Sequence, residues 1–538
     1  MIDKLSNQSR IIIATVLSFL FFATYDHFFI PKKVVPKEQT KVEQIQKDGA
    51  QASTATSNAP VSTSNAVTSA NIPTKVAKVS DEVIATIKAK TYEIRIDKLG
   101  RISKFYLNEA KFVDKKGERV QLVDAKLAPY PLEVRFTDQN INTQAFATPY
   151  SASQKNITVS KEGSKLTLTQ NLSGMKIVKT LTFFPNGHYS VNVKLDNNQE
   201  YFITPGYRPN VAVDHYTFHG SLIKQADDKL SVIKDGDAKG DETFQKAKFA
   251  ASADKYYTTM FYNFKKGLNV VVSPVNKEYP LLFIKGNQDL SFDGYMGPKE
   301  HTNLSALDPR LTDVIEYGFF TFIARPLFKL LQFLHSMLGN WGWSIVVMTM
   351  LIRVVLFPLT YKGMVSMNKL KALSPKIKEL QAKYKGDKQK LNAHMMELYK
   401  KHGANPMGGC LPIVLQIPVF FSIYRVLQNA IELKSAPWII WIHDLSVMDP
   451  YFILPVAMGA TMFLNQRITP TNMTDPMQEK IMKYLPLVFT FFFVTFPAGL
   501  TLYWFTNNLF SIAQQYYVNS LFKKGSEGKE VTVTKAKK

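Results

Sequence analysis

Arg353 carries the most informative chemistry in this chain, because it lies near the middle of an apolar run, WGWSIVVMTMLIRVVLFPLTY (341–361). No Asp or Glu lies in the interior of a membrane-length segment that could neighbour it. A guanidinium at the centre of a bilayer costs roughly 2.5 to 3.5 kcal/mol on insertion scales, so it normally faces protein or water. The simpler alternative is that the Arg353 side chain snorkels, which means that it extends to the membrane surface. However, Tyr361 at the end of the run is about 12 Å away along a helix, which is beyond its comfortable reach. We therefore predict a wet, positively charged cavity within the membrane.

The other residue types that could do chemistry do not assemble into a recognisable site. His215 and His219 are spaced i, i+4, but the intervening YTF favours a strand, along which the rings would lie roughly 13 Å apart and could not share a metal ion. His188 and His301 have no acidic partner at motif spacing, and no GxSxG, HExxH or P-loop motif occurs. The single cysteine, Cys410, can form no internal disulfide and is expected to pack as a small hydrophobe. We therefore expect no catalytic residue, no metal site and no cofactor, and a chain that is not an enzyme.

Composition separates a membrane part from a soluble part. Of the 538 residues 46% are hydrophobic, yet the long apolar stretches are confined to 11–30 and to about the last 220 residues. The net charge is +23, with 66 lysines and arginines, which suits nucleic acid, ribosomal RNA or anionic lipid. No aromatic RNA-binding stretch occurs, and the densest lysine clusters flank apolar segments. This placement favours anionic lipid or the ribosome over DNA.

The N-terminal region, 1–30, is predicted to be a transmembrane anchor. Its apolar segment (11–30) follows basic residues, as in a signal peptide or an uncleaved anchor. We favour the anchor because no small-x-small cleavage site follows, and because Asp26 and His27 lie where the helix would reach the far interface. Residues 31–80 contain no aromatic residue and are rich in Ser, Thr, Ala, Gln and Asn, so we expect a flexible linker.

Residues 81–309 are predicted to form a soluble all-β domain. TYEIRID (91–97) alternates apolar and polar residues, and the turn residues within 157–170 and 178–197 indicate two hairpins. Further strands are expected at 256–264 and 268–273. The length suffices for one large antiparallel sandwich with its own core. Because no catalytic set is recognisable, a binding or spacer role is favoured.

The C-terminal region alternates apolar segments with basic loops. Within 310–340, the segment 314–338 carries apolar residues at three-to-four spacing, which predicts an amphipathic helix in the membrane interface, broken or kinked at Pro326. Five apolar stretches follow, at 341–361, 411–431, 451–467, 484–497 and 500–519. Together with the anchor they predict six transmembrane helices.

The distribution of lysines orients these segments. The loop 362–410 has eleven lysines against three acids and the tail 520–538 has six lysines, whereas the loop 432–450 has one lysine and three acids. The positive-inside rule then places both chain ends in the cytoplasm and 31–309 outside, in the periplasm of a Gram-negative cell. Within 362–404 the apolar spacing predicts a hairpin of two amphipathic helices, which could meet lipid or a ribosome or simply be solvated.

Several motifs, in the expected order, resemble those of the YidC family of membrane protein insertases. They are Arg353 in its apolar run, NPMGGCLPIVLQIP (405–418), ELKSAPWIIWIHDLSVMDPYFILP (432–455), TDPMQEKIMKYLP (474–486) and FPAGLTLYW (496–504). The resemblance is strong over 310–520 and looser elsewhere. It implies a polytopic α-helical membrane protein with a five-helix insertase core (341–519) and a large periplasmic all-β supersandwich similar to galactose mutarotases.

The resemblance also implies a hydrophilic groove that opens to the cytoplasm and to lipid, and whose arginine matches Arg353. The expected groove residues are Arg353, Thr349 one turn above it, Gln416 and Asn508. A hydrophobic surface along the second and last core helices, here called the slide, is expected to contact the hydrophobic part of a substrate. Its residues are Ile417, Phe420, Tyr503 and Trp504. Packing, lipid contact and interhelical hydrogen bonding are the simpler roles for the same side chains.

By this resemblance the chain would insert inner-membrane proteins and help them to fold, alone or with the Sec translocon and its accessory subunits, without a nucleotide. The expected partners are nascent membrane proteins, the ribosome through the basic tail and hairpin, and anionic lipids. An ion-coupled transporter is a weaker alternative because it would need a carboxylate deep in its spans. A membrane-anchored periplasmic carbohydrate-modifying enzyme would need an acid/base set within 81–309. Arg425, a second cation in an apolar stretch, has no role that the sequence assigns.

Overall fold

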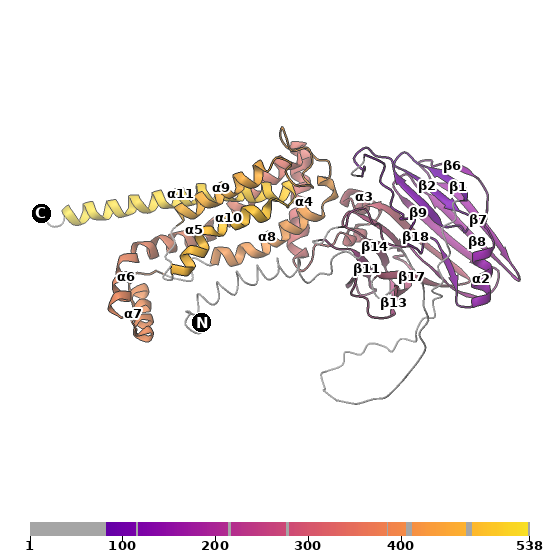
Figure 1. The fold of residues 1–538 in the computed structure, drawn as a ribbon, viewed down its shortest axis with the longest axis horizontal. Helices are drawn as coiled ribbons and strands as arrows, with labels where there is room; N and C mark the ends of the chain where they lie inside the picture. The colour runs from indigo at the N-terminus through magenta and orange to yellow at the C-terminus, as the bar shows by residue number, and fades with distance from the viewer. Residues whose placement is uncertain are drawn as a thin grey trace, which may run out of the picture. The chain divides into compact units, whose positions relative to one another are not determined.

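The structure is a computed structural model that describes residues 82–114, 117–213, 217–275, 279–384, 386–404, 411–469 and 476–535. Among these residues, 82–108 and 120–297 form a β-rich unit, while 109–119 and the residues from 298 onward form a helical unit. Figure 1 draws the sheets of the first and the helices of the second. The predicted anchor 11–30, the linker up to residue 80, His215 and Cys410 lie outside the described residues.

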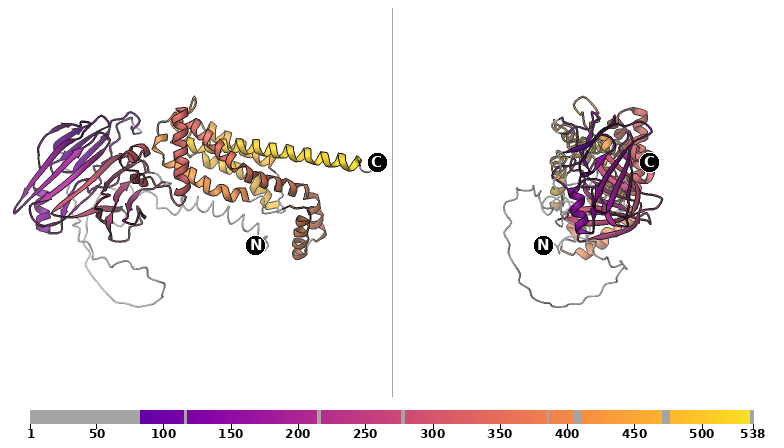
Figure 2. Two further views of the ribbon diagram at one scale, coloured as in Figure 1. Left: turned by 180° about the vertical axis from the view of Figure 1, so that it is seen from behind. Right: turned by 90° about the vertical axis from the view of Figure 1, so that its right-hand side faces the viewer.

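The described strands of the β-rich unit form three sheets (Figure 2). The strands are β1 Val83–Lys88, β2 Tyr92–Asp97, β3 Ile102–Leu107, β4 Val134–Phe136, β5 Ser151–Ala152, β6 Asn156–Thr158, β7 Ser164–Leu172, β8 Met175–Phe183, β9 His188–Leu195, β10 Glu200–Ile203, β11 Gly220–Lys224, β12 Leu230–Lys234, β13 Glu242–Ala247, β14 Phe249–Ala253, β15 Tyr257–Tyr262, β16 Leu268–Val275, β17 Tyr279–Asn287 and β18 Asp289–Pro298, with one helix, α2 Gln139–Ala147. Their orders are β3-β2-β1-β6, β13-β16-β17-β10-β4 and β12-β11-β14-β15-β18-β9-β8-β7-β5. The unit is therefore rich in β-sheet, as the alternating sequence indicates.

The two predicted hairpins have different outcomes. The hairpin within 178–197 is confirmed, because β8 and β9 pair antiparallel across the turn at 185–187, where Gly187 has a φ of +83°. The hairpin within 157–170 is wrong: β6 pairs in parallel with β1, whereas β7 pairs with β8 in another sheet. The chain does turn at Ser160, whose carbonyl accepts a hydrogen bond from the Gly163 N–H (3.2 Å). That turn carries the chain from one sheet to another, and the strand pairing in the β-rich unit is not purely antiparallel.

A buried network of charges lies inside the β-rich unit. Arg101 is fully buried and donates to Asp97 from Nε (2.9 Å) and Nη2 (2.7 Å), and to Glu133 from Nη1 (2.8 Å). Glu133 in turn accepts from Arg135 (2.9 Å), which is also buried. Each charge therefore has an opposite partner, which offsets the desolvation that burial imposes.

Lys179 is buried on the inward face of β8, where its ammonium donates to the carbonyls of Gly100 (2.7 Å) and Leu132 (3.1 Å). Burial lowers the pKa of Lys179 from 10.5 to about 7. Between these two pKa values the unfolded chain binds more protons than the folded chain, so the free energy of unfolding rises with pH. Below about pH 7 the buried ammonium is charged, and the free energy of unfolding is reduced by the full cost of burying that charge.

We expect the free energy of opening β8 to rise by about 2 kcal/mol from pH 7 to pH 9 because of Lys179. Hydrogen exchange of β8 peptides in the full-length protein, corrected for intrinsic exchange rates, measures this quantity. The control is Lys179→Met, which should remove the pH dependence. The same slope in both proteins would contradict the assignment.

The described part of the helical unit consists of α-helices of very different lengths and of two short 3-10 helices, labelled η2 and η4. They are α3 His301–Leu307, η2 Pro309–Val314, α4 Thr321–Leu338, α5 Trp341–Ala372, α6 Ser374–Lys383, α7 Lys388–Lys401, α8 Leu411–Asn429, η4 Ile431–Leu433, α9 Ile453–Ile468, α10 Pro476–Phe493 and α11 Ala498–Lys535. Helix α4 runs through Pro326 without interruption, so the predicted break is not present. It buries Phe328, Leu331 and Leu334 and exposes a second apolar row that includes Phe322 and Met337.

Helix α5 begins at a side-chain cap, because Asn340 Oδ1 accepts a hydrogen bond from the Trp343 N–H (3.1 Å). It continues past Tyr361 to Ala372, so the apolar run and the start of the basic loop form one helix. Within the described residues, α5 is the one helix whose length and apolar composition suffice to cross a membrane.

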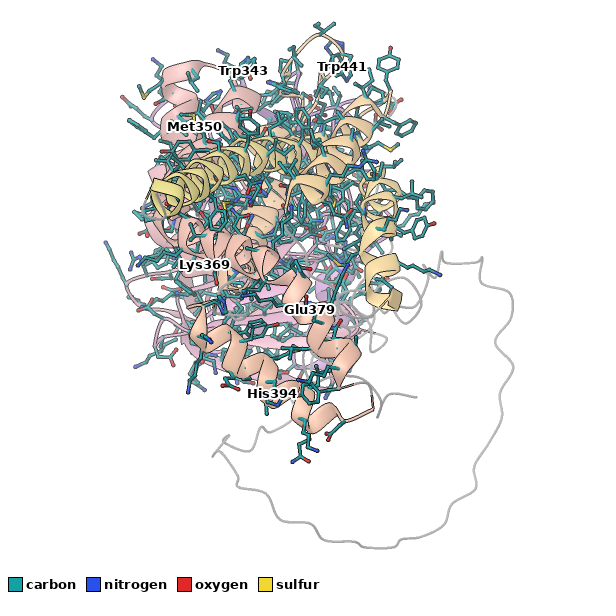
Figure 3. The ribbon with its side chains drawn as sticks, turned by 90° about the vertical axis from the view of Figure 1, so that its left-hand side faces the viewer. Trp343, Met350, Lys369, Glu379, His394 and Trp441 are labelled. Atoms are coloured by element: carbon teal, nitrogen blue, oxygen red, sulfur yellow. The ribbon has the colours of Figure 1, made fainter. Side chains whose placement is uncertain are left out.

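The lysine-rich loop contains two helices, α6 and α7. Asp387 caps α7 by accepting from the Lys390 N–H (3.0 Å), and Gly386 before it has a φ of +106°. Ile377 of α6 packs with Leu370 and with residues near the end of α7, which ties the hairpin to α5. In Figure 3 the labelled Trp343 and Trp441 lie at the top of the view, Glu379 lies below its middle and His394 lower still.

Candidate functional site

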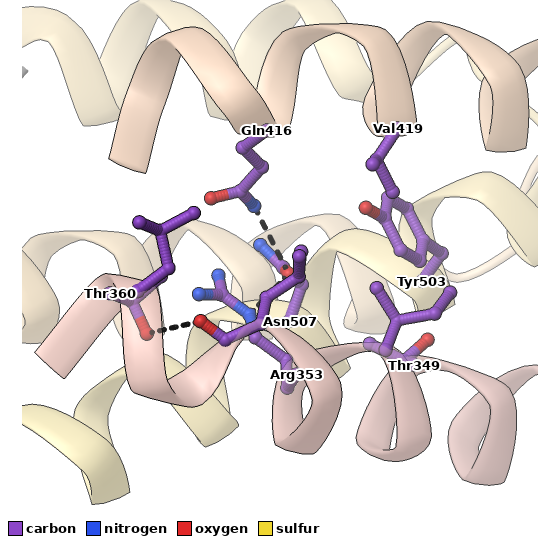
Figure 4. Close-up of a pocket in the computed structure, with 10 residues that line it drawn as sticks. Thr349, Arg353, Thr360, Gln416, Val419, Tyr503 and Asn507 are labelled. Carbon is purple, nitrogen blue, oxygen red and sulfur yellow. Dashed lines mark hydrogen bonds between the residues drawn. The ribbon is translucent and has the colours of Figure 1, made fainter. Parts of the chain in front are cut away.

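A cavity lies among α5, α8 and α11 and is lined by both polar and apolar side chains (Figure 4). The lining residues are Thr349, Ile352, Arg353, Leu356, Leu359, Thr360, Gln416, Val419, Tyr503 and Asn507. The volume open to the centre of a water molecule is about 20 Å³. Because one water needs roughly 10 to 15 Å³ by this measure, the cavity has room for one or two waters and not for a peptide.

Arg353 is the charged residue of this lining, and only 8% of its surface is exposed. Its Nε donates to Asn507 Oδ1 (2.8 Å), and its own carbonyl accepts from Gln514 Nε2 (3.2 Å). Figure 4 shows the terminal nitrogens of the guanidinium in the space between Thr360 and Gln416. No described carboxylate lies within ion-pair distance of Arg353, so the cavity retains a positive charge, as the sequence predicts from the absence of membrane carboxylates.

The neutral polar groups of the cavity are held by the helices that carry them. Thr349 donates to the carbonyl of Ile345 (2.7 Å), one turn earlier in α5. Thr360 likewise donates to the carbonyl of Leu356 (3.2 Å). Gln416, on α8, donates from Nε2 to the Asn507 Oδ1 that Arg353 also uses (3.3 Å). The polar lining thus presents hydroxyl oxygens, an amide and a cation, a set that can replace water around a polar chain segment.

Three of the four predicted groove residues line the cavity: Arg353, Thr349 and Gln416. The fourth, Asn508, is buried outside the lining, and its Nδ2 has no hydrogen-bond partner among the described residues. Asn507, the residue before it, lines the cavity and accepts from Arg353. Consecutive residues of a helix point about 100° apart, so the two positions are not interchangeable.

The predicted slide residues separate into two environments. Ile417 is 38% exposed, and Phe420 packs edge-on against Trp504 with 4.6 Å between ring centroids. Trp504 also packs against Phe493 of α10 at 5.0 Å. Tyr503, by contrast, is buried and lines the cavity. An aromatic surface formed by Phe420 and Trp504 therefore adjoins the polar cavity, and Tyr503 lies on the cavity side of it.

A second polar cluster, which is not among the predicted site residues, lies between α5 and α11. Asn519 Oδ1 accepts from Asn368 Nδ2 (2.9 Å) and from Gln515 Nε2 (2.8 Å), and Asn519 Nδ2 donates to the carbonyl of Ile468 in α9 (3.2 Å). The amides at positions 507 and 508 are followed seven residues later by those at 514 and 515, and Asn519 comes four residues after Gln515. That spacing is the signal for a polar seam along α11 that could have been found in the sequence.

The helices around the cavity are not equally attached to one another. Helix α11 packs along both α5 and α9, whereas α8 packs mainly against α4 and touches α5 and α11 only sparsely. The described residues contain no cluster of His, Cys, Asp or Glu suited to a metal ion. The site offers hydrogen bonding and charge inside the cavity, with aromatic side chains beside it.

Two family models match the chain, one described as "60Kd inner membrane protein" over residues 333–525 and one as "YidC periplasmic domain" over residues 84–330. A protein from Campylobacter jejuni with the name Membrane protein insertase YidC is 55% identical over 97% of this chain and 98% of its own length. Proteins of the same name from Helicobacter pylori (strain 26695) and Pseudomonas putida (strain GB-1) are 46% and 36% identical, over 97% and 88% of this chain and 97% and 89% of their own lengths.

Proposed function

Because the chain belongs to the YidC family of membrane protein insertases, we propose that it inserts proteins into the inner membrane and helps them to fold, alone or beside the Sec translocon. The observation that carries the proposal is Arg353, a buried cation without an ion-pair partner among the described residues, in a cavity bounded by a helix of membrane-spanning length. A cation in such a place is costly unless polar groups meet it. The polar part of an incoming protein would supply them.

The proposed architecture has six spans, with both chain ends in the cytoplasm and the β-rich unit in the periplasm. The anchor 11–30 would be the first span, and α5 and α8 to α11 the other five. The lysine-rich hairpin α6–α7 and the basic tail would then face the cytoplasm, where they could meet anionic lipid and the ribosome. This arrangement rests on lysine placement and family resemblance.

In the proposed mechanism the polar tail of a substrate enters the cavity and exchanges water for Arg353, Gln416 and Asn507. Each polar group that finds such a partner avoids a penalty of about 1 to 3 kcal/mol for being buried without a hydrogen bond. The cavity must widen first, because it has room for only one or two waters. Movement of α8 is the simplest way, since its contacts with α5 and α11 are sparse.

The apolar part of the substrate would leave along the exposed side of the cavity, past Ile417, Phe420 and Trp504, into lipid. Each Leu, Ile, Phe or Val placed near the bilayer centre contributes roughly 0.3 to 0.6 kcal/mol on insertion scales. A span of about 20 such residues therefore supplies several kcal/mol. We propose that this partitioning drives insertion, without a nucleotide and without a catalytic residue.

The test is to reconstitute the purified full-length protein into liposomes and measure protease-protected insertion of a single-span protein with an acidic translocated tail. No nucleotide and no other protein is added. Insertion above that in protein-free liposomes is the expected result. Insertion no better than in protein-free liposomes would contradict an autonomous insertase.

A further inference from the structure

Asn507 joins three helices at one oxygen atom. Its Oδ1 on α11 accepts from Arg353 Nε on α5 (2.8 Å) and from Gln416 Nε2 on α8 (3.3 Å). Both partners can only donate through these atoms, so the amide must turn its oxygen, not its nitrogen, toward them. The side chain is 9% exposed. The orientation of Asn507 is therefore fixed by chemistry as well as by packing.

The bond to Asn507 decides which part of the Arg353 guanidinium remains available. A guanidinium can grip a carboxylate through its side edge, which uses Nε and one terminal nitrogen, or through its end, which uses both terminal nitrogens. Asn507 occupies Nε, and the terminal nitrogens have no partner among the described residues. The end of the guanidinium is thus the free edge, and it points into the cavity between Thr360 and Gln416 (Figure 4).

We propose that Asn507 is a positioning residue, which holds Arg353 by Nε so that its two terminal nitrogens present one end-on site for an acidic group of the substrate. The inference rests on the proposed function and deepens it, because it assigns a preference for acidic over neutral tails to a pair of residues. An uncharged acceptor suits this role: it fixes the guanidinium without cancelling its charge. An aspartate at the same place would pair with Arg353 and remove the attraction.

The simpler role for Asn507 is interhelical adhesion, in which its hydrogen bonds only stabilise the bundle. The two roles differ in their effect on substrate choice. Loss of adhesion lowers insertion of all substrates together. Loss of positioning lowers insertion of acidic tails more than that of neutral tails, so the ratio between two matched substrates separates the roles.

The experiment uses full-length protein in liposomes of one fixed composition, with two single-span reporters that differ only in Asp or Asn residues in the translocated tail. In Asn507→Asp we expect the ratio of acidic to neutral insertion to fall about tenfold, the effect of losing one charge-assisted contact. In Asn507→Leu, which removes the acceptor without adding a charge, we expect a fall of about threefold. Added salt should lower the ratio in the wild type and have little effect in Asn507→Asp, because the attraction is already cancelled.

Thr506→Val is the matched control, because Thr506 is buried at the preceding position of α11 and does not line the cavity. It should keep the wild-type ratio. A ratio in Asn507→Asp within about twofold of the wild type would overturn the role of Asn507 while leaving the proposed function in place. A wild-type protein that inserts neither reporter would overturn the proposed function, and this inference with it.

Discussion

Replacing Arg353 with glutamate is expected to reduce insertion of a substrate with an acidic translocated tail to the level of protein-free liposomes. The change reverses the charge in the cavity, so an attraction becomes a repulsion. At an effective dielectric constant of about 20, two unit charges about 4 Å apart interact by about 4 kcal/mol. Even a fraction of this change corresponds to a rate loss of a hundredfold or more. Protease protection of the reporter in liposomes measures the loss.

Two further variants of this protein distinguish the effect of charge in the cavity from the effect of charge elsewhere on α5. Lys362→Glu makes the same reversal at an exposed position of α5 outside the cavity lining, and it should retain most of the insertion. Arg353→Lys keeps the charge but loses the planar guanidinium, so we expect insertion of the acidic reporter between that of the wild type and that of Arg353→Glu. The explanation would fail if Arg353→Glu inserted the acidic reporter within about threefold of the wild type.

The position of Arg353 in a partly polar cavity could be predicted because it depends only on the residue types along one segment. A cation in an apolar run without a carboxylate in reach must find protein or water, whatever the helices around it do. Gln416 and Thr349 are expected in the groove from the family resemblance, and both line the cavity. Residues whose types conflict with their surroundings can therefore be found without a structure.

The choice between Asn507 and Asn508 could not be made in this way. Both are amides in the same turn, and only the rotation of α11 decides which of them meets Arg353. That rotation is set by the packing of α11 against α5 and α9, which involves segments far apart in the sequence. The amides along α11 could have been found from their spacing, but the contact of Asn519 with Asn368 of α5 depends on the same packing.

The same distinction applies to the strands, since pairing between segments adjacent in the sequence can be predicted and pairing between distant segments cannot. Alternation along β8 and β9, with a turn at 185–187, predicts both strands and their pairing because the partners adjoin in the chain. For β6 the alternation indicates a strand, but its partner is β1, about 70 residues earlier. Alternation of apolar and polar residues with a period of two identifies the residues that face inward, but it does not identify the partner strand.

The buried charges of the β-rich unit allow a second prediction of large effect. Arg101→Met is expected to destabilise the sheet that contains β2 and β3 by about 3 to 5 kcal/mol, because Asp97 would lose its guanidinium partner and Glu133 one of two while staying buried. None of the five tryptophans lies in this unit, so tryptophan fluorescence would not report its unfolding. Hydrogen exchange of β2 and β3 peptides in the full-length protein is the appropriate measurement.

Arg95→Met provides the matched control for Arg101→Met, since Arg95 lies on β2 and pairs with Glu93 (3.0 Å) with 37% of its side chain exposed. Water screens that pair, so its loss should cost about 1 kcal/mol or less. The contrast tests burial itself, because both variants remove an arginine from one carboxylate-rich region. Equal effects would mean that the buried network adds nothing beyond a surface ion pair. A large difference would mean that Arg101 is required to keep Asp97 and Glu133 in the interior, where apolar residues alone could not hold them.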